Sequence, residues 1–393
     1  MASIPGSHYN VFVSNQVVNF GMTTDPNNVP APVAGNFNLE VITNASGTGS
    51  FSTAAGYQGL AIISTNGSVF TAAHGSYGVQ DTGGNDSIFA GDGNVSILGA
   101  AGDTITGGSS GNQFLDADLG NQLVFGGTGG NETIWGGTGA TIIGGAGNVT
   151  IGGTSGDTIT GGTGNYFIDA HVSNQSIVGG SAGNGTIWGG AGDTIIGGAG
   201  NVTIGGGAGD TITGGTGNYF IDAHLTNQSV VGGSGGNGTI WGGAGDTIRG
   251  GAGNVTIGGG AGDTIIGGSG TEFIDASLGN QSVVGGSGNE TIWGAAGDTI
   301  QGASGSGQAL IGFAGGNQTA WDDGATSTGN DSIFGFSQSS NDRISLNGST
   351  DTISNVAGSA VTSGGNTTIT LSDGSHITLL GVSSINNSFF TTH

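Results

Sequence analysis

The feature that most constrains this chain is a long internal repeat. Four tryptophans recur at steps of 53, 53 and 52 residues: Trp135, Trp188, Trp241 and Trp293. An aspartate and an asparagine recur with the same 53-residue step through Asp116 and Asn121. Chains that repeat a long unit fold by stacking identical pieces, each of which contacts only its neighbours. Four copies of one unit therefore span about residues 90 to 300.

Each long unit contains a shorter repeat of about nine residues. Seven isoleucines that end the short motifs are spaced by 8, 9, 8, 9, 9 and 10 residues: Ile134, Ile142, Ile151, Ile159, Ile168, Ile177 and Ile187. Each motif consists of Gly-Gly-x-Gly, one or two polar residues, and Thr-Ile or an equivalent pair. Glycine permits tight turns and the β-branched pair favours a short strand. Two strands and two turns give a coil of about 18 residues, so that three coils make up the 53-residue unit.

This pattern predicts an all-β fold, a parallel β-solenoid (β-roll or β-helix) with β caps at both ends. We expect an N-terminal β region over 1–80, the glycine-rich solenoid over 81–320 and a C-terminal β cap over 321–393. The first region contains alternating segments at 9–20, 37–43 and 59–64, and serves as a cap or as assembly strands. Strand alternation points the threonines outward and the following isoleucines inward. The inward set is Ile105, Ile151, Ile159, Ile204, Ile212, Ile257 and Ile265.

Composition narrows the possible partners. The chain has 26 acidic side chains against two basic ones, a net charge of −24, and no cysteine. Such a surface repels phosphate, so nucleic acid is not an expected partner, and multivalent cations are. No run of 18 apolar residues is present, which argues against membrane insertion. The first ten residues lack the basic and apolar segments of a cleavable signal.

Aligning the coils predicts two columns of polar turn residues. One column holds Asn148, Asn165, Asn184, Asn201, Asn218, Asn237, Asn254, Thr271 and Asn289, which we interpret as a hydrogen-bonded ladder that keeps buried amides satisfied. The opposite column holds Asp157, Gln175, Asp193, Asp210, Gln228, Asp246, Asp263, Gln281 and Asp298. Stacked carboxylates repel one another unless a cation lies between them, and hard oxygen ligands favour Ca²⁺. The alternative is a solvated acidic stripe.

Parts of the chain resemble the RTX family, the glycine-rich, calcium-binding repeat proteins that bacteria secrete. The segments Gly-Asn-Asp-Ser-Ile-Phe at 84–89 and 329–334 are similar to its nonapeptide pattern, whereas central repeats have Val202 or Tyr219 at the aspartate position. Segments 333–346 and 368–382 are similar to the region that ends many RTX arrays. The resemblance implies Ca²⁺ as cofactor and an uncleaved C-terminal type I secretion signal. It also implies a secreted, extracellular or cell-surface location.

Together the column and the resemblance define the candidate metal ligands. They are Asp86, Asp103, Asp157, Asp193, Asp210, Asp246, Asp263, Asp298 and Asp331.

The tryptophans are the candidate assembly residues. In Thr-Ile-Trp an inward isoleucine places the tryptophan outward, so Trp135, Trp188, Trp241 and Trp293 are expected on one face. Exposed tryptophan usually marks an interface. Self-association is the first interpretation, and packing under a neighbouring loop or cap and stacking on cell-surface glycans are the alternatives. The outward threonines raise an ice-binding interpretation as well, against the simpler one of β propensity on a solvated face.

Sequence features that point to catalysis are weak. The pairs Asp169-Ala-His171 and Asp222-Ala-His224 recur, but the histidine position is Asp118 or Ser277 in the other units, which is typical of solvated turns. We therefore expect no enzyme activity. The predicted function is a secreted structural protein that self-assembles, with calcium, into a fibre, surface layer or biofilm matrix. The alternatives are an adhesin or an ice- or glycan-binding module, and then an enzyme exported by an RTX tail.

Overall fold

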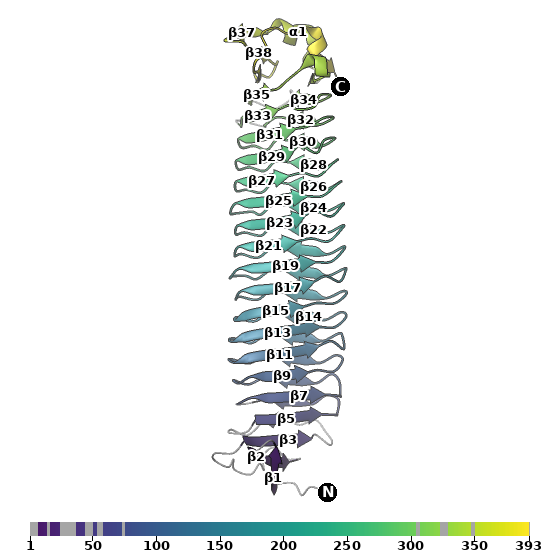
Figure 1. The fold of residues 1–393 in the computed structure, drawn as a ribbon, viewed down its shortest axis with the longest axis vertical. Helices are drawn as coiled ribbons and strands as arrows, with labels where there is room; N and C mark the ends of the chain where they lie inside the picture. Colours follow the sequence, from purple (N-terminus) through teal and green to yellow (C-terminus); the bar gives the residue numbers. More distant parts are fainter. Residues whose placement is uncertain are drawn as a thin grey trace. The chain divides into compact units, whose positions relative to one another are not determined.

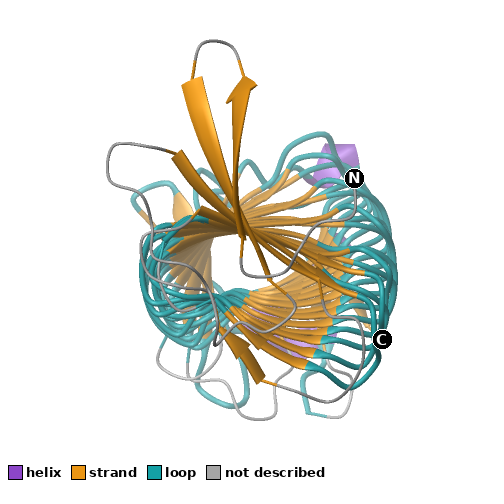
Figure 2. Cartoon of the chain, turned by 90° about the horizontal axis from the view of Figure 1, so that it is seen from below, coloured by secondary structure: helices purple, strands orange, loops and turns teal. Residues whose placement is uncertain are grey.

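The computed structural model describes residues 7–13, 16–23, 37–43, 50–52, 58–72, 75–303, 307–322, 329–346 and 350–392. The chain is an all-β parallel solenoid, as predicted, in which successive strands alternate between two sheets (Figure 1). It divides into two compact units, Met1–Gly190 with Gly198–Gly200, and Ala191–Gly197 with Asn201–His393. Both units are built on the same plan, a sheet of longer strands facing a sheet of short strands across the interior of each coil (Figure 2).

In unit 1 the odd-numbered strands and β2 form the long-strand sheet. Its strands are β1 (Ser7–Val13), β2 (Gln16–Thr23), β3 (Phe37–Thr43), β5 (Gln58–Ile63), β7 (Tyr77–Asp81), β9 (Val95–Leu98), β11 (Asn112–Ala117), β13 (Asn131–Gly136), β15 (Asn148–Gly152), β17 (Tyr166–Ala170) and β19 (Gly185–Gly189). The short-strand sheet holds β4 (Ser50–Ser52), β6 (Val69–Thr71), β8 (Ser87–Phe89), β10 (Thr104–Thr106), β12 (Leu123–Phe125), β14 (Thr141–Ile143), β16 (Thr158–Thr160) and β18 (Ser176–Val178). β1 pairs antiparallel with β2, and from β2 onward the pairing is parallel.

Unit 2 repeats this arrangement. Its long-strand sheet contains β21 (Val202–Gly205), β23 (Tyr219–Ala223), β25 (Gly238–Gly242), β27 (Val255–Gly258), β29 (Glu272–Ala276), β31 (Glu290–Gly294), β33 (Ala309–Gly312), β35 (Asn330–Phe334), β37 (Val361–Ser363), β38 (Asn366–Thr370) and β39 (His376–Leu379). Its short-strand sheet contains β20 (Thr194–Ile196), β22 (Thr211–Thr213), β24 (Ser229–Val231), β26 (Thr247–Arg249), β28 (Thr264–Ile266), β30 (Ser282–Val284), β32 (Thr299–Gln301), β34 (Thr319–Asp322), β36 (Arg343–Leu346) and β40 (Phe390–Thr392).

The helical content of the described chain is small. One α-helix, α1 (Ile353–Gly358), and two 3₁₀ turns, η2 (Gln338–Ser340) and η3 (Asn387–Phe389), lie in the C-terminal part of unit 2. There β37, β38 and β39 pair antiparallel, which ends the regular coil pattern. Among the described residues, no helix has the length and apolar character needed to cross a membrane.

The core of each coil is a thin apolar layer. Corresponding side chains stack because the strands pair in register, for example Ile142 opposite Ile159 in β14 and β16. All seven isoleucines predicted to point inward are 0% exposed. The threonines before them are exposed or half-buried, so the predicted alternation is confirmed. Stacks of β-branched side chains fill the narrow interior and pack well on a pleated surface.

The turn before each short strand has a left-handed residue. Gly209 adopts φ +75° and Gly262 adopts φ +76°, and each precedes a buried aspartate. In the coils where a glutamine replaces the aspartate, the left-handed residue is an asparagine, as at Asn174 (φ 64°) and Asn227 (φ 61°). Glycine and asparagine are the residues that tolerate this conformation. The turn therefore reverses the chain and directs the next side chain into the coil.

The predicted asparagine ladder is present, but on the surface. Asn165 donates from Nδ2 to Oδ1 of Asn148 at 3.2 Å, and both side chains are exposed. Further along, the ladder bonds run from backbone to side chain, as from Asn237 N–H to Oδ1 of Asn218 at 2.8 Å. The expectation that this column satisfies buried amides is wrong, because the turn holds the side chains at the rim of the coil.

The N-terminal region is built on the solenoid plan. The three alternating segments predicted there correspond to β1 and β2, β3, and β5. Parallel pairing already joins β3 to β5 and β5 to β7, so coil stacking begins before residue 81.

Substitution of Gly209 tests how much the left-handed conformation of the turn contributes to stability. A Cβ at residue 209 meets no atom within 4 Å, so substitution there changes only the backbone conformational energy. We expect Gly209→Ala to destabilise unit 2 by about 1–2 kcal/mol, and Gly209→Asn to cost clearly less. Chemical denaturation of the two variants measures the difference. Equal denaturation midpoints for the Gly209→Ala and Gly209→Asn variants would show that the left-handed conformation at residue 209 carries no strain.

Candidate metal centre

Eight of the nine predicted metal ligands are buried, in a column of the same kind in each unit. Each lies directly before a short strand and is at most 1% exposed: Asp86, Asp103 and Asp157 in unit 1, and Asp193, Asp210, Asp246, Asp263 and Asp298 in unit 2. Gln122, Gln175, Gln228 and Gln281 occupy the same place in other coils and are 1–2% exposed. We call this column the Asp/Gln ladder. The hypothesis of a solvated acidic stripe is wrong here, because these side chains point into the coil.

Backbone amides hold the carboxylates of the Asp/Gln ladder. Oδ1 of Asp210 accepts a hydrogen bond from the N–H of Asp193, one coil earlier, at 2.8 Å. Its Oδ2 accepts from the N–H of Gly207, three residues earlier, at 2.6 Å. Asp263 makes the same two bonds, to Asp246 and Gly260, at 2.8 and 2.6 Å. Each carboxylate thus closes its own turn and ties it to the preceding coil, a role that needs no cation.

The glutamines relieve the electrostatic cost of this column. Burial raises the pKa of Asp210 to about 6, against the backbone hydrogen bonds, which lower it, and the charge of Asp193 adds to the rise. A neutral amide in every third coil limits the number of adjacent carboxylates. Gln228 also closes its own turn, but as a donor: its Nε2 donates a hydrogen bond to the carbonyl oxygen of Leu225 at 3.3 Å.

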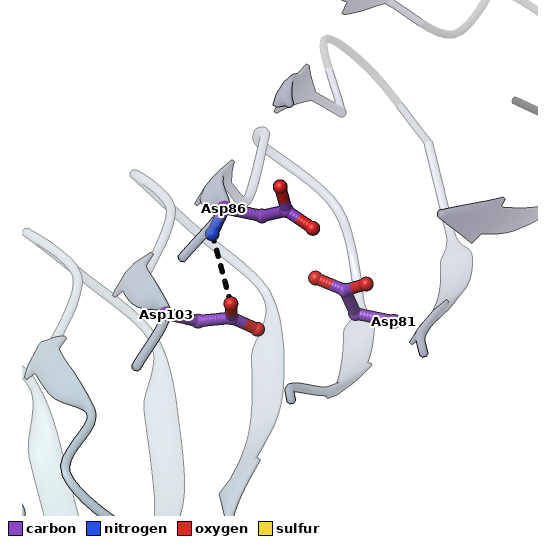
Figure 3. A group of neighbouring side chains, drawn as sticks. All are labelled: Asp81, Asp86 and Asp103. Carbon is purple, nitrogen blue, oxygen red and sulfur yellow. Dashed lines mark hydrogen bonds between the residues drawn. The ribbon is translucent and has the colours of Figure 1, made fainter. Parts of the chain in front are cut away.

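One cluster in unit 1 differs from the rest of the column. Asp81, Asp86 and Asp103 bring carboxylate oxygens within 4.8 Å of one another (Figure 3). Asp81 comes from the end of β7, and the other two precede β8 and β10. The three side chains are 5%, 1% and 0% exposed. We call this cluster the aspartate triad.

The aspartate triad has carboxylate oxygens that the protein leaves without donors. Asp103 has both oxygens bonded, to the N–H groups of Asp86 at 2.9 Å and Ala100 at 2.6 Å. By contrast, Oδ2 of Asp81 and Oδ2 of Asp86 are buried and have no hydrogen-bond partner among the described residues. Burial, and then the neighbouring Asp86 side chain, raises the pKa of Asp81 to about 8. Without a cation, Asp81 therefore retains a proton at neutral pH, and a bound cation would take the place of that proton.

The donor set fits a hard cation. Ca²⁺ takes six to eight oxygen ligands from carboxylates, carbonyls and water in a flexible geometry. Gly83 leaves room beside the triad: a Cβ there would stand 2.8 Å from Oδ2 of Asp86 and 2.9 Å from the carbonyl oxygen of Thr65. Asp81, Asp86 and Asp103 are the residues that would hold the ion, and the Thr65 carbonyl lies close enough to the same space to contribute.

Two of the three triad members, Asp86 and Asp103, are among the metal ligands predicted from the sequence, and Asp86 belongs to the RTX-like segment. Asp81 is not among the predicted ligands. Alternation in β7 carries the signal that could have found it, since Tyr77, Val79 and Asp81 are the buried residues of that strand. The ninth predicted ligand, Asp331, lies in β35 of the long-strand sheet, where Oδ1 accepts from the N–H of Ala309 at 2.9 Å.

The predicted assembly residues lie on the outer face of the long-strand sheet. Trp135, Trp188, Trp241 and Trp293 are 45%, 37%, 45% and 51% exposed. In unit 1 the strand register places Gly152 and Asp169 between Trp135 and Trp188, three strand spacings apart. Unit 2 repeats this order with Gly258 and Asp275. The outward orientation is confirmed, and these exposures contradict the alternative that a described loop covers the rings.

The recurring Asp-His pairs form exposed turn contacts. Nδ1 of His224 lies 2.7 Å from Oδ1 of Asp222, and their side chains are 67% and 32% exposed. His171 makes the same contact with Asp169. This geometry matches the interpretation of these pairs as solvated turns.

A second buried carboxylate pair lies inside unit 2. Glu272 and Glu290 are direct neighbours in β29 and β31 and are 1% and 3% exposed. None of their four carboxylate oxygens makes a hydrogen bond of regular geometry, although the two carboxyl groups and backbone N–H groups lie close to one another. Burial, and then the charge of Glu272, raises the pKa of Glu290 to about 8. At neutral pH this pair therefore retains a proton.

Comparison with known proteins adds no assignment. The chain matches no family model, and no curated protein matches it.

The glutamate pair predicts an unusual pH dependence. The folded state retains the Glu290 proton up to about pH 8, whereas an exposed glutamate releases it near pH ~4.3. Folded unit 2 then binds more protons than the unfolded chain between those values, so its stability falls as pH rises through this window. We expect Glu290→Gln to flatten the fall. Urea denaturation at a series of pH values compares the variant with the unaltered chain, and parallel profiles would contradict the assignment.

Proposed function

We propose that this protein is a secreted, non-enzymatic structural protein whose solenoid Ca²⁺ stabilises and which self-associates into extracellular matrix material. The observation that carries the proposal is the aspartate triad. Two buried carboxylate oxygens there have no donor, although the other aspartates of the same column are satisfied by backbone amides. Buried polar atoms without partners are destabilising, and a bound cation supplies the partner that these two oxygens lack.

Calcium binding couples folding to the surroundings of the protein. An ion that binds only the folded state stabilises it by about 2.7 kcal/mol when its concentration is 100 times the dissociation constant. The chain then gains stability in a calcium-rich extracellular medium. This agrees with the resemblance of segment 84–89, which contains Asp86, to RTX calcium-binding repeats.

The open end of unit 1 supports self-association. Among the described strands, β1 pairs with β2, and no described strand pairs with its other edge. Edge strands of this kind are templates for pairing with another chain. A net charge of −24 keeps copies apart at low salt, and divalent cations screen that repulsion. Assembly is therefore expected to need calcium as well.

Calcium titration with matched variants tests the metal site. We expect the thermal midpoint of the chelator-treated protein to rise on addition of Ca²⁺. Asp81→Asn should abolish that rise, because it removes a ligand carboxylate. Asp210→Asn is the control: its carboxylate is buried but fully bonded, so this variant loses stability and keeps the response to Ca²⁺. A chelated protein that Ca²⁺ leaves unchanged would rule out the proposed site.

Electron microscopy tests the structural role. Purified protein imaged with Ca²⁺ and with chelator should show ordered assemblies only in the first sample, because cations both complete the fold and screen repulsion. Dispersed monomers at every protein and calcium concentration would refute self-assembly while leaving calcium binding intact.

A further inference from the structure

The long-strand sheet carries a repeated surface element that neither the core nor the aspartate triad uses. It consists of a tryptophan, the aspartate paired with it in the preceding coil, and the glycine paired with it in the following coil. Asp116, Trp135 and Gly152 form one copy in unit 1. Asp222, Trp241 and Gly258 form another in unit 2. We call each set an indole ledge.

Glycine fixes the indole ring flat on the sheet. A Cβ added to Gly152 would fall on the ring atoms of Trp135, and the same holds for Gly258 and Trp241. Each ring therefore covers the backbone of the following coil and presents its other side to solvent, with 45% of the residue exposed. A flat ring held in one orientation is a pre-organised stacking surface, because little conformational entropy remains to be lost on binding.

Polar groups border each ring. Asp116 pairs directly with Trp135 and its side chain lies on the same face, about 4.8 Å away along the sheet. It is half-buried, with Oδ1 accepting from the N–H of Asp118 at 3.2 Å. In the second ledge Oδ1 of Asp222 lies 2.7 Å from Nδ1 of His224. These contacts orient the carboxylates next to the rings.

The carboxylates decide which partner fits. A second copy of the chain would bring the same acidic face, and the chain has only two basic residues, Arg249 and Arg343, to pair with its 26 acidic ones. Burying the ledge carboxylates against a protein surface without cationic partners is costly. A pyranose ring has an apolar C–H face that stacks on indole and hydroxyl groups that donate to carboxylate. A polyanionic glycan is repelled by the net charge of −24.

We propose that the indole ledges bind a neutral polysaccharide, one sugar ring stacking on each tryptophan while its hydroxyls bond the adjacent aspartate. The aspartate–tryptophan pair recurs within each unit: Asp169 pairs with Trp188 in unit 1, and Asp275 with Trp293 in unit 2. A long glycan chain can therefore contact both tryptophans of one unit, and multivalent contact strengthens weak single sites. This inference rests neither on calcium binding nor on self-association.

Depletion from suspensions of insoluble glycans tests the inference on the full chain. The probes are amorphous cellulose, a β-1,3-glucan and chitin, with polygalacturonate as the anionic control. We expect binding to at least one neutral glycan and none to the anionic one. The double variant Trp135→Ala/Trp241→Ala should bind about tenfold or more weakly. Phe89→Ala, which removes an aromatic residue 38% exposed on the short-strand sheet, should bind normally.

Two further variants separate the ledge from general loss of structure. Gly152→Ala/Gly258→Ala retains both tryptophans but displaces the rings, and Asp116→Asn/Asp222→Asn retains the rings but weakens the acceptors. Both should weaken glycan binding with circular dichroism spectra unchanged. Absence of binding to all three neutral glycans, or unaltered binding by the tryptophan double variant, would overturn the proposal. If that double variant instead dissociated oligomers in sedimentation while still binding glycan, the occupant of the ledges would be a second copy of the chain.

Discussion

Hydrogen bonding from one coil to the next is the interaction on which each unit depends. A coil of two short strands encloses only a thin apolar layer, so side-chain burial alone leaves the turns unsupported. The Asp/Gln ladder supplies that support: a carboxylate such as that of Asp210 bonds the backbone of its own turn and of the preceding coil. Buried amide groups need such partners, since an unsatisfied one costs about 1–3 kcal/mol. The ladder thus makes repeated tight turns compatible with a dry interior.

The supply of backbone donors also explains where buried carboxylates are left without hydrogen bonds. Where a ladder carboxylate has two backbone donors, its burial is compensated. Where another carboxylate is added, as Asp81 is beside Asp86, the backbone donors are exhausted and oxygens remain unbonded. The glutamate pair inside unit 2 lacks hydrogen bonds of regular geometry as well, and Glu290 retains a proton to about pH 8. Sites of ligand binding or titration therefore arise where buried acids outnumber the available amide groups.

On the outer face of the long-strand sheet, the parallel register determines which side chains lie next to one another. Parallel register places one residue of each coil directly beside its counterpart in the next, so a 53-residue repeat produces a surface pattern every third coil. Aspartate, tryptophan and glycine then alternate in one column. The chemistry of that column, a flat ring next to a carboxylate, suits a polyhydroxyl ligand better than an acidic protein surface.

Much of this architecture follows from the sequence alone. The repeat spacing determined the coil length, the parallel register, the inward isoleucines and the outward tryptophans, because strand alternation assigns each position to a face once the period is known. Tertiary structure decided the rest. Asp210 lies inside the coil and Asn237 lies at its rim, although a left-handed glycine precedes each of them, so the side on which a turn residue lies is set by the whole turn and its neighbouring coils. The triad likewise needs the turn after β7 to bring Asp81 back beside Asp86, whereas alternation in β7 indicates only that Asp81 is buried.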